Sequence, residues 1–220
     1  MKTLYLERST GECRKGEWVE KLDLEGIERV VVGTGPGSFA GIRSALAFAQ
    51  GYAIGTKCEV LGLPSSCALA ADHFAAQAAN RPVAPAPQSD NRTIEQSEPS
   101  SSSPFAVVGD ARQGKFWIAL FDGYRLVCDI FQTDKEHLPY RVPQGVKVTT
   151  PDAKRIDALL KEVFGDNYIG GGTPTPEGLR HFAEANPAIL KPEPKAAKSR
   201  MAFRRFSATS VSTLSRRKVR

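Results

Sequence analysis

A glycine-rich turn between a strand and a helix constrains this chain more than any other feature of its sequence. After the apolar run Val30–Val32 comes a turn of small residues: Gly33, Gly35, Pro36 and Gly37. Glycine permits backbone conformations in such a turn that a side chain would forbid. Ser38 follows, and it suits the N-cap of a helix because its hydroxyl can accept a hydrogen bond from the first helical turn. The segment therefore predicts a strand–turn–helix unit.

The helix expected over Phe39–Ala53 combines an apolar face with a stripe of small residues. The apolar positions recur at helical spacing: Ile42, Ala45, Leu46, Ala49 and Ala53. Gly41, Ala45 and Ala49 lie four residues apart, so another helix can approach this stripe closely. We therefore predict that the helix binds a partner protein through Phe39, Gly41, Ile42, Arg43, Ala45, Leu46 and Ala49. The alternative is that this face packs on the chain's own sheet.

The turn also has to be compared with nucleotide-binding loops, and two of three such motifs fail on spacing. A Walker loop needs four residues between its first glycine and its Gly-Lys pair, whereas Gly35 and Gly41 have five between them. A dinucleotide fingerprint fits residues 35–40, but Glu59 opens the next strand instead of closing it. Anion binding by the amides at the helix start stays open, beside a purely structural turn. A phosphate- or nucleotide-binding enzyme that uses Gly33–Ser38 is therefore the alternative function.

The second half of the chain predicts a strand hairpin followed by a helix. Phe105–Val108 and Lys115–Phe121 are apolar runs joined by a polar turn, and both faces of the second run are apolar. Such a strand is typical of the centre of a sheet that is covered on both sides. We expect the hairpin partner of the second strand over Arg125–Phe131. We also expect a helix over Asp157–Phe164, and a short strand with a glycine turn over residues 168–172.

The sequence offers no group of residues that predicts catalysis. Asp110 can accept hydrogen bonds from the backbone amides of its turn, and Arg112 can pair with it or face solvent. His73, His137 and His181 stand apart, so the sequence has no histidine pair at metal-binding helical spacing. We therefore predict no catalytic residue, no metal and no cofactor, with structural roles for Asp110 and Arg112.

Three motifs, in order along the chain, resemble the TsaB (YeaZ) family. Gly35–Arg43 is similar to the family's Gly-Pro-Gly-Ser-Phe-Thr-Gly-Leu-Arg signature. Residues 61–70 resemble the segment in which a short strand enters a helix, and Val107–Trp117 resembles the family's strand–Asp-Ala-Arg–strand hairpin. The resemblance extends over residues 25–77 and 105–172, well over half of the chain.

This resemblance implies a fold and a function. The fold is α/β, an actin-like, ribonuclease-H-like (ASKHA) arrangement of two lobes, with the N-terminal lobe truncated because residues 1–28 are too short for the elements that relatives place there. The function is that of a non-catalytic scaffold, because catalytic relatives use a histidine pair. It pairs with a TsaD-type catalytic subunit and helps to recruit a TsaE-type ATPase. Together they transfer a threonylcarbamoyl group to the adenosine beside the anticodon (t6A), so the scaffold meets tRNA indirectly. A homodimer is the alternative assembly.

Composition divides the chain into four segments. We expect an N-terminal lobe over 1–79, a Pro/Ser-rich disordered insertion over 80–104, a C-terminal lobe over 105–190 and a basic disordered tail over 191–220. The tail carries +9 in a chain of net charge +6, which leaves the rest at −3. One interpretation is that the tail contacts RNA phosphates. The alternative is that it is a solvated end with no dedicated partner.

The sequence also predicts a compartment. No apolar run approaches the roughly 18 residues of a membrane-spanning helix, and the first residues do not resemble a secretory signal. The four cysteines, Cys13, Cys58, Cys67 and Cys128, have no C-x-x-C spacing. Reduced, buried thiols are therefore expected. We predict a soluble, cytoplasmic protein.

Overall fold

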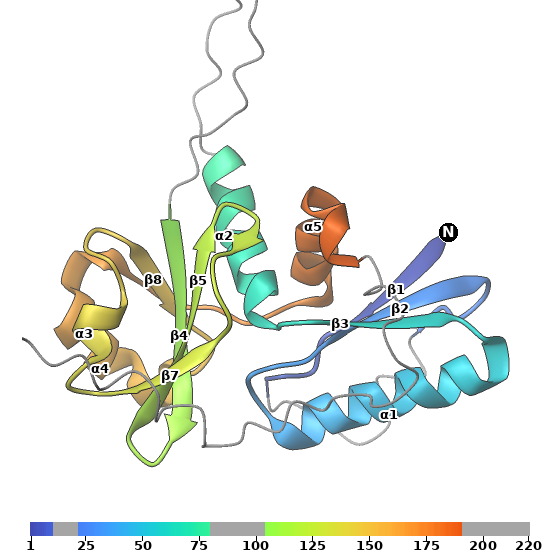
Figure 1. Cartoon of the computed structure of the whole chain (residues 1–220), viewed down its shortest axis with the longest axis horizontal. Coiled ribbons are helices and arrows are strands. Elements are labelled where there is room, and N and C mark those ends of the chain that lie inside the picture. Colours follow the sequence, from blue (N-terminus) through green and yellow to red (C-terminus); the bar gives the residue numbers. More distant parts are fainter. Residues whose placement is uncertain (11–21, 80–103, 191–220) are drawn as a thin grey trace, which may run out of the picture. The chain divides into compact units, whose positions relative to one another are not determined.

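The computed structural model describes residues 1–10, 22–79 and 104–190, and these residues form two sheets with helices on their faces (Figure 1). The first sheet contains β1 (Lys2–Leu6), β2 (Ile27–Gly33) and β3 (Glu59–Leu63). Its strands are all parallel, in the order β1-β2-β3. The predicted strand at Val30–Val32 is confirmed as the centre of β2.

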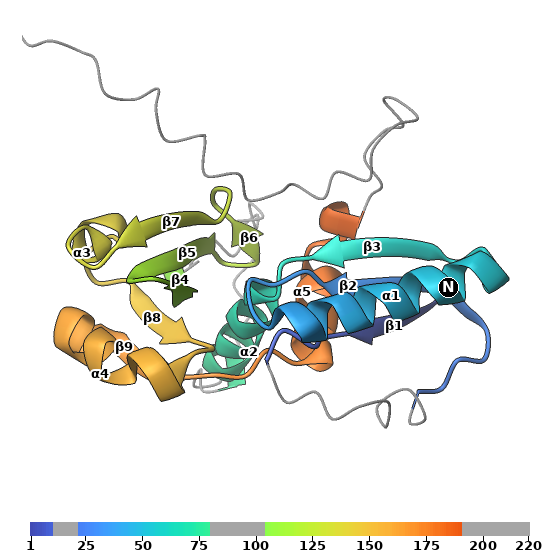
Figure 2. The ribbon, with the colours of Figure 1, turned by 90° about the horizontal axis from the view of Figure 1, so that it is seen from below.

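Helices cover both faces of this first sheet. Along β2, Val30 and Val32 point to one face and Val31 to the other, as the alternation of a strand requires. Val30 and Val32 pack with α1 (Phe39–Thr56). The opposite face is covered by α5 (Pro176–Ala185), so that α1 and α5 lie on either side of the sheet (Figures 1 and 2). Apolar residues therefore fill both sides of β2.

The second sheet mixes parallel and antiparallel strands. Its members are β4 (Pro104–Arg112), β5 (Lys115–Asp122), β6 (Arg125–Leu126), β7 (Phe131–Asp134), β8 (Lys147–Thr150) and β9 (Tyr168–Gly171). The order is β6-β5-β4-β8-β9, with β7 also paired to β5. Strands β4, β8 and β9 are parallel, whereas β5 is antiparallel to its neighbours. Buried residues on both faces confirm β5 as a central strand.

One face of the second sheet packs on α3 (Leu138–Arg141) and α4 (Ala153–Phe164). The other face packs on α2 (Ser66–Ala79), in the cluster that includes Phe105 and Phe121. Two short 3₁₀ turns, η1 (Gly165–Asn167) and η2 (Pro187–Leu190), follow α4 and α5.

Helices α2 and α5 each pack on the sheet from which they do not emerge. Helix α2 leaves the first sheet after β3 but packs on β4, with the ring of His73 stacked 4.0 Å from that of Phe105. Helix α5 follows β9 of the second sheet but packs on β1 and β2. The two helices also contact each other closely. They therefore link the two sheets of residues 1–190.

The expected α/β fold is confirmed, with differences in detail. The predicted hairpin partner at Arg125–Phe131 is wrong as a single strand, because β6 and β7 are separate and both pair with β5. The predicted insertion (80–104) and tail (191–220) lie outside the described residues, apart from Pro104, which begins β4. Ahead of β2, the described residues contain the single strand β1. In the ranges that the structure describes, no helix has the length and apolar character needed to cross a membrane.

The glycine-rich turn and the outer face of helix α1

The backbone at Arg8 and Ser9 crosses directly over the start of α1. A Cβ atom added to Gly41 would lie 1.9 Å from the carbonyl oxygen of Arg8, and one added to Gly37 would lie 2.4 Å from that of Ser9. The amide of Ser38 donates a hydrogen bond to the same Ser9 oxygen, at 2.5 Å. These two glycines are therefore needed for close packing of one chain segment on another.

The backbone amides of the turn donate hydrogen bonds to acceptors within the chain. The amide of Thr34 donates to the carbonyl of Leu63 at 2.8 Å, and that of Gly35 donates to the Ser65 hydroxyl at 2.9 Å. Gly35 adopts φ +87°, the left-handed region that glycine favours. The hydroxyl of Ser38 accepts from the amide of Gly41, which agrees with its predicted N-cap role. These contacts favour a structural turn over an anion-binding one.

The acidic residue that a dinucleotide site would need is also engaged elsewhere. Glu59 stands at the first position of β3 and pairs with Arg29 on β2, with 2.7 Å between the carboxylate and Nε. A ribose-binding carboxylate belongs at the opposite, carboxyl end of such a strand. The geometry therefore does not bring Glu59 to the turn.

A buried carboxylate that the sequence did not single out lies beside the turn. Glu7 follows β1, and its Oε1 accepts a hydrogen bond from the Ser9 amide at 2.6 Å. Its Oε2 is buried and has no hydrogen-bond partner among the described residues. That oxygen lies where a side chain on Gly33 would have to be, because a Cβ there would come within 1.9 Å of it. Gly33 is therefore also required by packing.

The stripe of small residues on α1 faces the chain's own sheet. Gly41, Ala45 and Ala49 are buried, and the two alanines belong to the cluster formed by Leu6, Ile27, Val30 and Val32. These three residues are thus buried within the chain, which is the arrangement that the alternative to partner contact describes. Small side chains suit this position because they let the helix approach the sheet closely.

The opposite side of α1 carries the exposed members of the predicted set. Phe39 is 69% exposed, and the guanidinium of Arg43 lies 5.1 Å from the centre of its ring. Ile42 and Leu46 are half-buried. Ile54, near the end of the helix, is 85% exposed. The spacing of Phe39, Arg43, Leu46 and Ile54 places these residues on one side of the helix, which we name the outer face of α1.

Asp110 joins the end of β4 to the start of α4. Its Oδ1 accepts from the amide of Arg112 at 2.7 Å, and its Oδ2 lies 3.2 Å from Nη1 of Arg155. Arg155 also contacts Asp152 at 2.5 Å, and Asp152 accepts from the Asp110 amide at 3.0 Å. The side chain of Arg112 is 71% exposed, with its own nitrogen 4.0 Å from Asp110. Both carboxylates are thus occupied, in agreement with a structural role for Asp110.

The cysteines and metal-ligating residues give further detail. Cys67 is buried, and this burial raises the pKa of its thiol, whereas Cys58 is half-buried and Cys128 exposed. The expectation of burial is therefore wrong for Cys128, and Cys13 lies outside the described residues. Across residues 1–10, 22–79 and 104–190, no group of three or more His, Cys, Asp or Glu is placed to hold a metal ion.

Comparisons with known proteins find similarity to the TsaD family and to YeaZ proteins. Residues 19–94, which include the glycine turn and α1, match the family model of TsaD, the tRNA N6-adenosine threonylcarbamoyltransferase. The structure is similar to that of YeaZ from Pseudomonas aeruginosa, with a TM-score of 0.57 and 17% identity over 84% of this chain and 92% of that one. A search of the curated proteins by sequence finds no match.

A second solved structure agrees with the first. It is described as an uncharacterized protein with similarity to peptidase YEAZ from Pseudomonas aeruginosa, and it has a TM-score of 0.52 and 17% identity. The alignment covers 79% of this chain and 72% of that chain. The fold is therefore the mixed α/β fold of the YeaZ proteins, which is consistent with an actin-like, ribonuclease-H-like class.

The matched segment and the fold agree with each other. They show similarity to the TsaD family over residues 19–94 and to the fold of YeaZ, as the motifs at Gly35–Arg43 and Val107–Trp117 predict. The resemblance stated from the sequence is thus confirmed.

Proposed function

We propose that this chain is a non-catalytic scaffold subunit of a t6A-forming complex. It binds a TsaD-type catalytic subunit through the outer face of α1 and helps to recruit a TsaE-type ATPase, while tRNA is bound by the assembled complex. The YeaZ fold and the match of residues 19–94 to the TsaD model support this proposal. The observation that carries it is the division of α1 into a buried inner face and an exposed apolar outer face.

The outer face of α1 has the chemistry of a protein-binding surface. Phe39 and Ile54 are large apolar side chains that are 69% and 85% exposed. Burying such a side chain contributes roughly 1.5–3 kcal/mol. The guanidinium of Arg43 rests on the ring of Phe39, and aromatic residues and arginine are enriched among the residues that dominate binding energy. A helix with such a face commonly docks into an apolar groove of a partner.

The inner stripe takes no part in this proposed contact. Ala45 and Ala49 have no exposed surface, because they pack on β1 and β2. A partner that reached them would have to displace the chain's own sheet. The partner must therefore meet Phe39, Arg43 and Ile54, with the half-buried Leu46 between them.

A binding experiment with matched surface variants tests the proposal. The double variant Phe39→Glu, Ile54→Glu places two charges on the outer face of α1 without touching the core. Tyr140→Glu is the control, because Tyr140 on α3 is 85% exposed, as Ile54 is. Binding to the TsaD-type subunit of the same organism is measured by analytical ultracentrifugation, with circular dichroism to verify folding.

We expect the double variant to bind roughly a hundredfold more weakly or worse, since it loses the burial of two large apolar side chains. The control should bind as the unmodified chain does. Equal binding by all three proteins would contradict the proposal. Sedimentation of the chain alone tests whether it forms a homodimer. The proposal would also be contradicted if the chain formed a stable dimer that the double variant dissociates and did not bind the TsaD-type subunit.

A further inference from the structure

Arg43 is the only charged residue of α1, and it stands on the outer face of that helix. The eighteen residues Phe39–Thr56 contain no aspartate, glutamate, lysine or histidine. Arg43 is exposed, and its guanidinium lies 5.1 Å from the centre of the Phe39 ring. A guanidinium held on an aromatic ring loses less freedom when it binds an anion. The outer face of α1 thus presents one positioned positive charge beside exposed apolar side chains.

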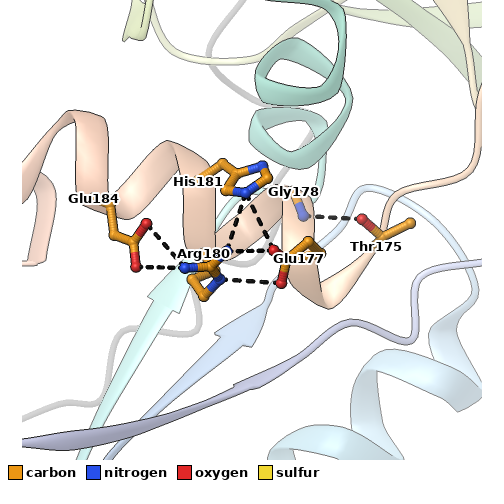
Figure 3. Close-up of polar contacts among 6 residues, drawn as sticks. All are labelled: Thr175, Glu177, Gly178, Arg180, His181 and Glu184. Atoms are coloured by element: carbon orange, nitrogen blue, oxygen red, sulfur yellow. Dashed lines mark hydrogen bonds and ion pairs between the residues drawn. The ribbon is translucent and has the colours of Figure 1, made fainter. Parts of the chain in front are cut away.

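Arg180 on α5 shows how an arginine is paired within this chain. Its Nε donates to Oε2 of Glu177 at 3.0 Å, and its Nη1 donates to Oε1 of Glu184 at 2.9 Å (Figure 3). Both glutamates lie on the same helix as Arg180. Arg43 has no carboxylate on its own helix, and in the part of the chain that the structure describes no ion pair joins it to a carboxylate. Its charge is therefore unmatched among these residues.

The position of Arg43 does not serve the stability of α1 either. Ser38 is the N-cap, so Arg43 lies in the N-terminal part of the helix, toward the positive end of the helix dipole. The first turn contains no acidic residue that would offset this charge. Arg141 provides a contrast, because it stands in the last turn of α3, where a cation is favoured. The helix dipole therefore accounts for the placement of Arg141 and not for that of Arg43.

We propose that Arg43 binds a carboxylate on the protein that covers the outer face of α1. This inference rests on the proposed function, in which that protein is the TsaD-type subunit. It adds the chemistry of the partner's surface, which is an apolar groove with an aspartate or glutamate at one end. A carboxylate accepts two parallel hydrogen bonds from one guanidinium, and this gives the contact a defined geometry.

The single charge also sets the direction in which α1 lies in the groove. Arg43 and Ile54 are eleven residues apart, which corresponds to roughly 16 Å along a helix that rises about 1.5 Å per residue. An apolar groove alone would accept α1 in either direction, because Phe39 and Ile54 place a large apolar side chain near each end. A carboxylate at the end that receives Arg43 distinguishes the two directions. Electrostatic complementarity typically contributes to orientation and association rate in this way.

A second copy of this chain suits the outer face of α1 less well. In a symmetric dimer the same face meets itself, so each Arg43 would approach a helix that carries no carboxylate. The only charges on the two facing helices would both be positive. The charge on this face therefore favours a different protein as its occupant.

Binding of charge variants to the TsaD-type subunit of the same organism tests the proposal. Arg43→Gln removes the charge and Arg43→Glu reverses it, and neither changes the buried side of α1. Arg141→Glu is the matched control, because Arg141 is also exposed and also has no ion pair among the described residues. Surface plasmon resonance measures association and dissociation at about 50 mM and about 500 mM salt. Circular dichroism verifies that each variant is folded.

We expect Arg43→Gln to bind roughly tenfold more weakly and Arg43→Glu roughly a hundredfold, since the first loses a charge-assisted hydrogen bond and the second adds repulsion. The control should bind as the unmodified chain does. High salt should weaken binding of the unmodified chain more than that of Arg43→Gln, which lacks the charge that salt screens. A lysine scan of the partner's exposed carboxylates should find one position at which lysine restores binding of Arg43→Glu.

Equal binding by the unmodified chain, Arg43→Gln and Arg43→Glu at both salt concentrations would overturn the proposal. If Phe39→Glu, Ile54→Glu fails to bind in that same assay, the proposed function stands and only the role of Arg43 is lost. A lysine scan in which no position restores Arg43→Glu would also overturn the proposal. So would a dimer of the chain alone that Arg43→Glu dissociates, because a second copy would then occupy this face. Absence of binding by the unmodified chain would contradict the proposed function, and the role of Arg43 with it.

Discussion

The carbonyl oxygen of Arg8 lies directly over Gly41, so close that a Cβ atom at Gly41 would stand 1.9 Å from it. This relationship explains a glycine inside the first turn of α1, where glycine otherwise lowers helix stability. The segment that follows β1 can reach the start of α1 only because Gly41 has no side chain. The conspicuous glycines of the turn thus belong to the packing of the first sheet and its helix.

Replacing Gly41 should therefore destabilise the chain, although alanine is the better helix former. We expect Gly41→Ala to lower the free energy of unfolding by roughly 1–3 kcal/mol, the usual cost of overpacking. Gly51→Ala is the control in the same helix, because a Cβ there meets nothing within 4 Å. It should raise stability by roughly 0.5–1 kcal/mol. Urea denaturation measures both, and a stabilising Gly41→Ala would show that the Arg8 segment is not held over the helix.

A charge on the inner stripe of α1 should unfold the monomer. Ala45 has no exposed surface, so Ala45→Arg would bury an unpaired charge against β2, at a cost of roughly 3–5 kcal/mol. Ala47→Arg is the control, since Ala47 is exposed on the same helix and should tolerate the change. Circular dichroism on heating separates the two. A folded, stable Ala45→Arg that fails only in partner binding would restore the stripe as a partner contact.

Arg155 should matter more than its place on the surface of α4 suggests. It contacts Asp110 and Asp152, whose side chains are each only 16% exposed. Arg155→Leu would remove the cation that the two carboxylates share and leave Asp110 only the exposed Arg112 at 4.0 Å, so we expect a loss of roughly 1–3 kcal/mol. Arg125→Leu is the control, because its pair with Asp122 is far more exposed and should contribute well under about 1 kcal/mol. Equal losses in the two variants would contradict this account.

The glycine turn should not bind nucleotides. The amides of Thr34, Gly35 and Ser38 already donate to acceptors within the chain, so they are not available to a phosphate group. We expect isothermal titration of the isolated chain with ATP, and separately with inorganic phosphate, to show no saturable heat. Stoichiometric binding of either would revive the phosphate-binding alternative.

Local sequence patterns predicted the elements around the turn well. The runs around β2 and α1 are long and periodic, and the turn chemistry marks where one ends and the other begins. Strand β1 was not predicted, because five residues ending in a charged stretch carry little periodic signal. Helix α5 was also missed, although Thr175 and Pro176 form a recognisable helix start and Leu179 and Phe182 have helical spacing.

The candidate site was predicted only in part, for a physical reason. A helix with small residues four positions apart can closely approach either another helix or a sheet. The spacing of Gly41, Ala45 and Ala49 therefore does not predict which of the two they contact. Contacts between distant segments were also out of reach, as with the Asp110 amide and Asp152, which lie 42 residues apart in sequence. Residue type predicted the turn role of Asp110, whereas its charged partner became visible only in the fold.

The central claim, a scaffold for t6A formation that works through the outer face of α1, is tested most directly by the amount of t6A formed on tRNA. The assay combines the TsaD-type and TsaE-type proteins of the same organism with a threonylcarbamoyl donor, and with or without this chain. We predict that t6A formation is lost without the chain, returns with the unmodified chain or Tyr140→Glu, and does not return with Phe39→Glu, Ile54→Glu. Undiminished t6A formation in the absence of the chain, or full restoration by the double variant, would contradict the account.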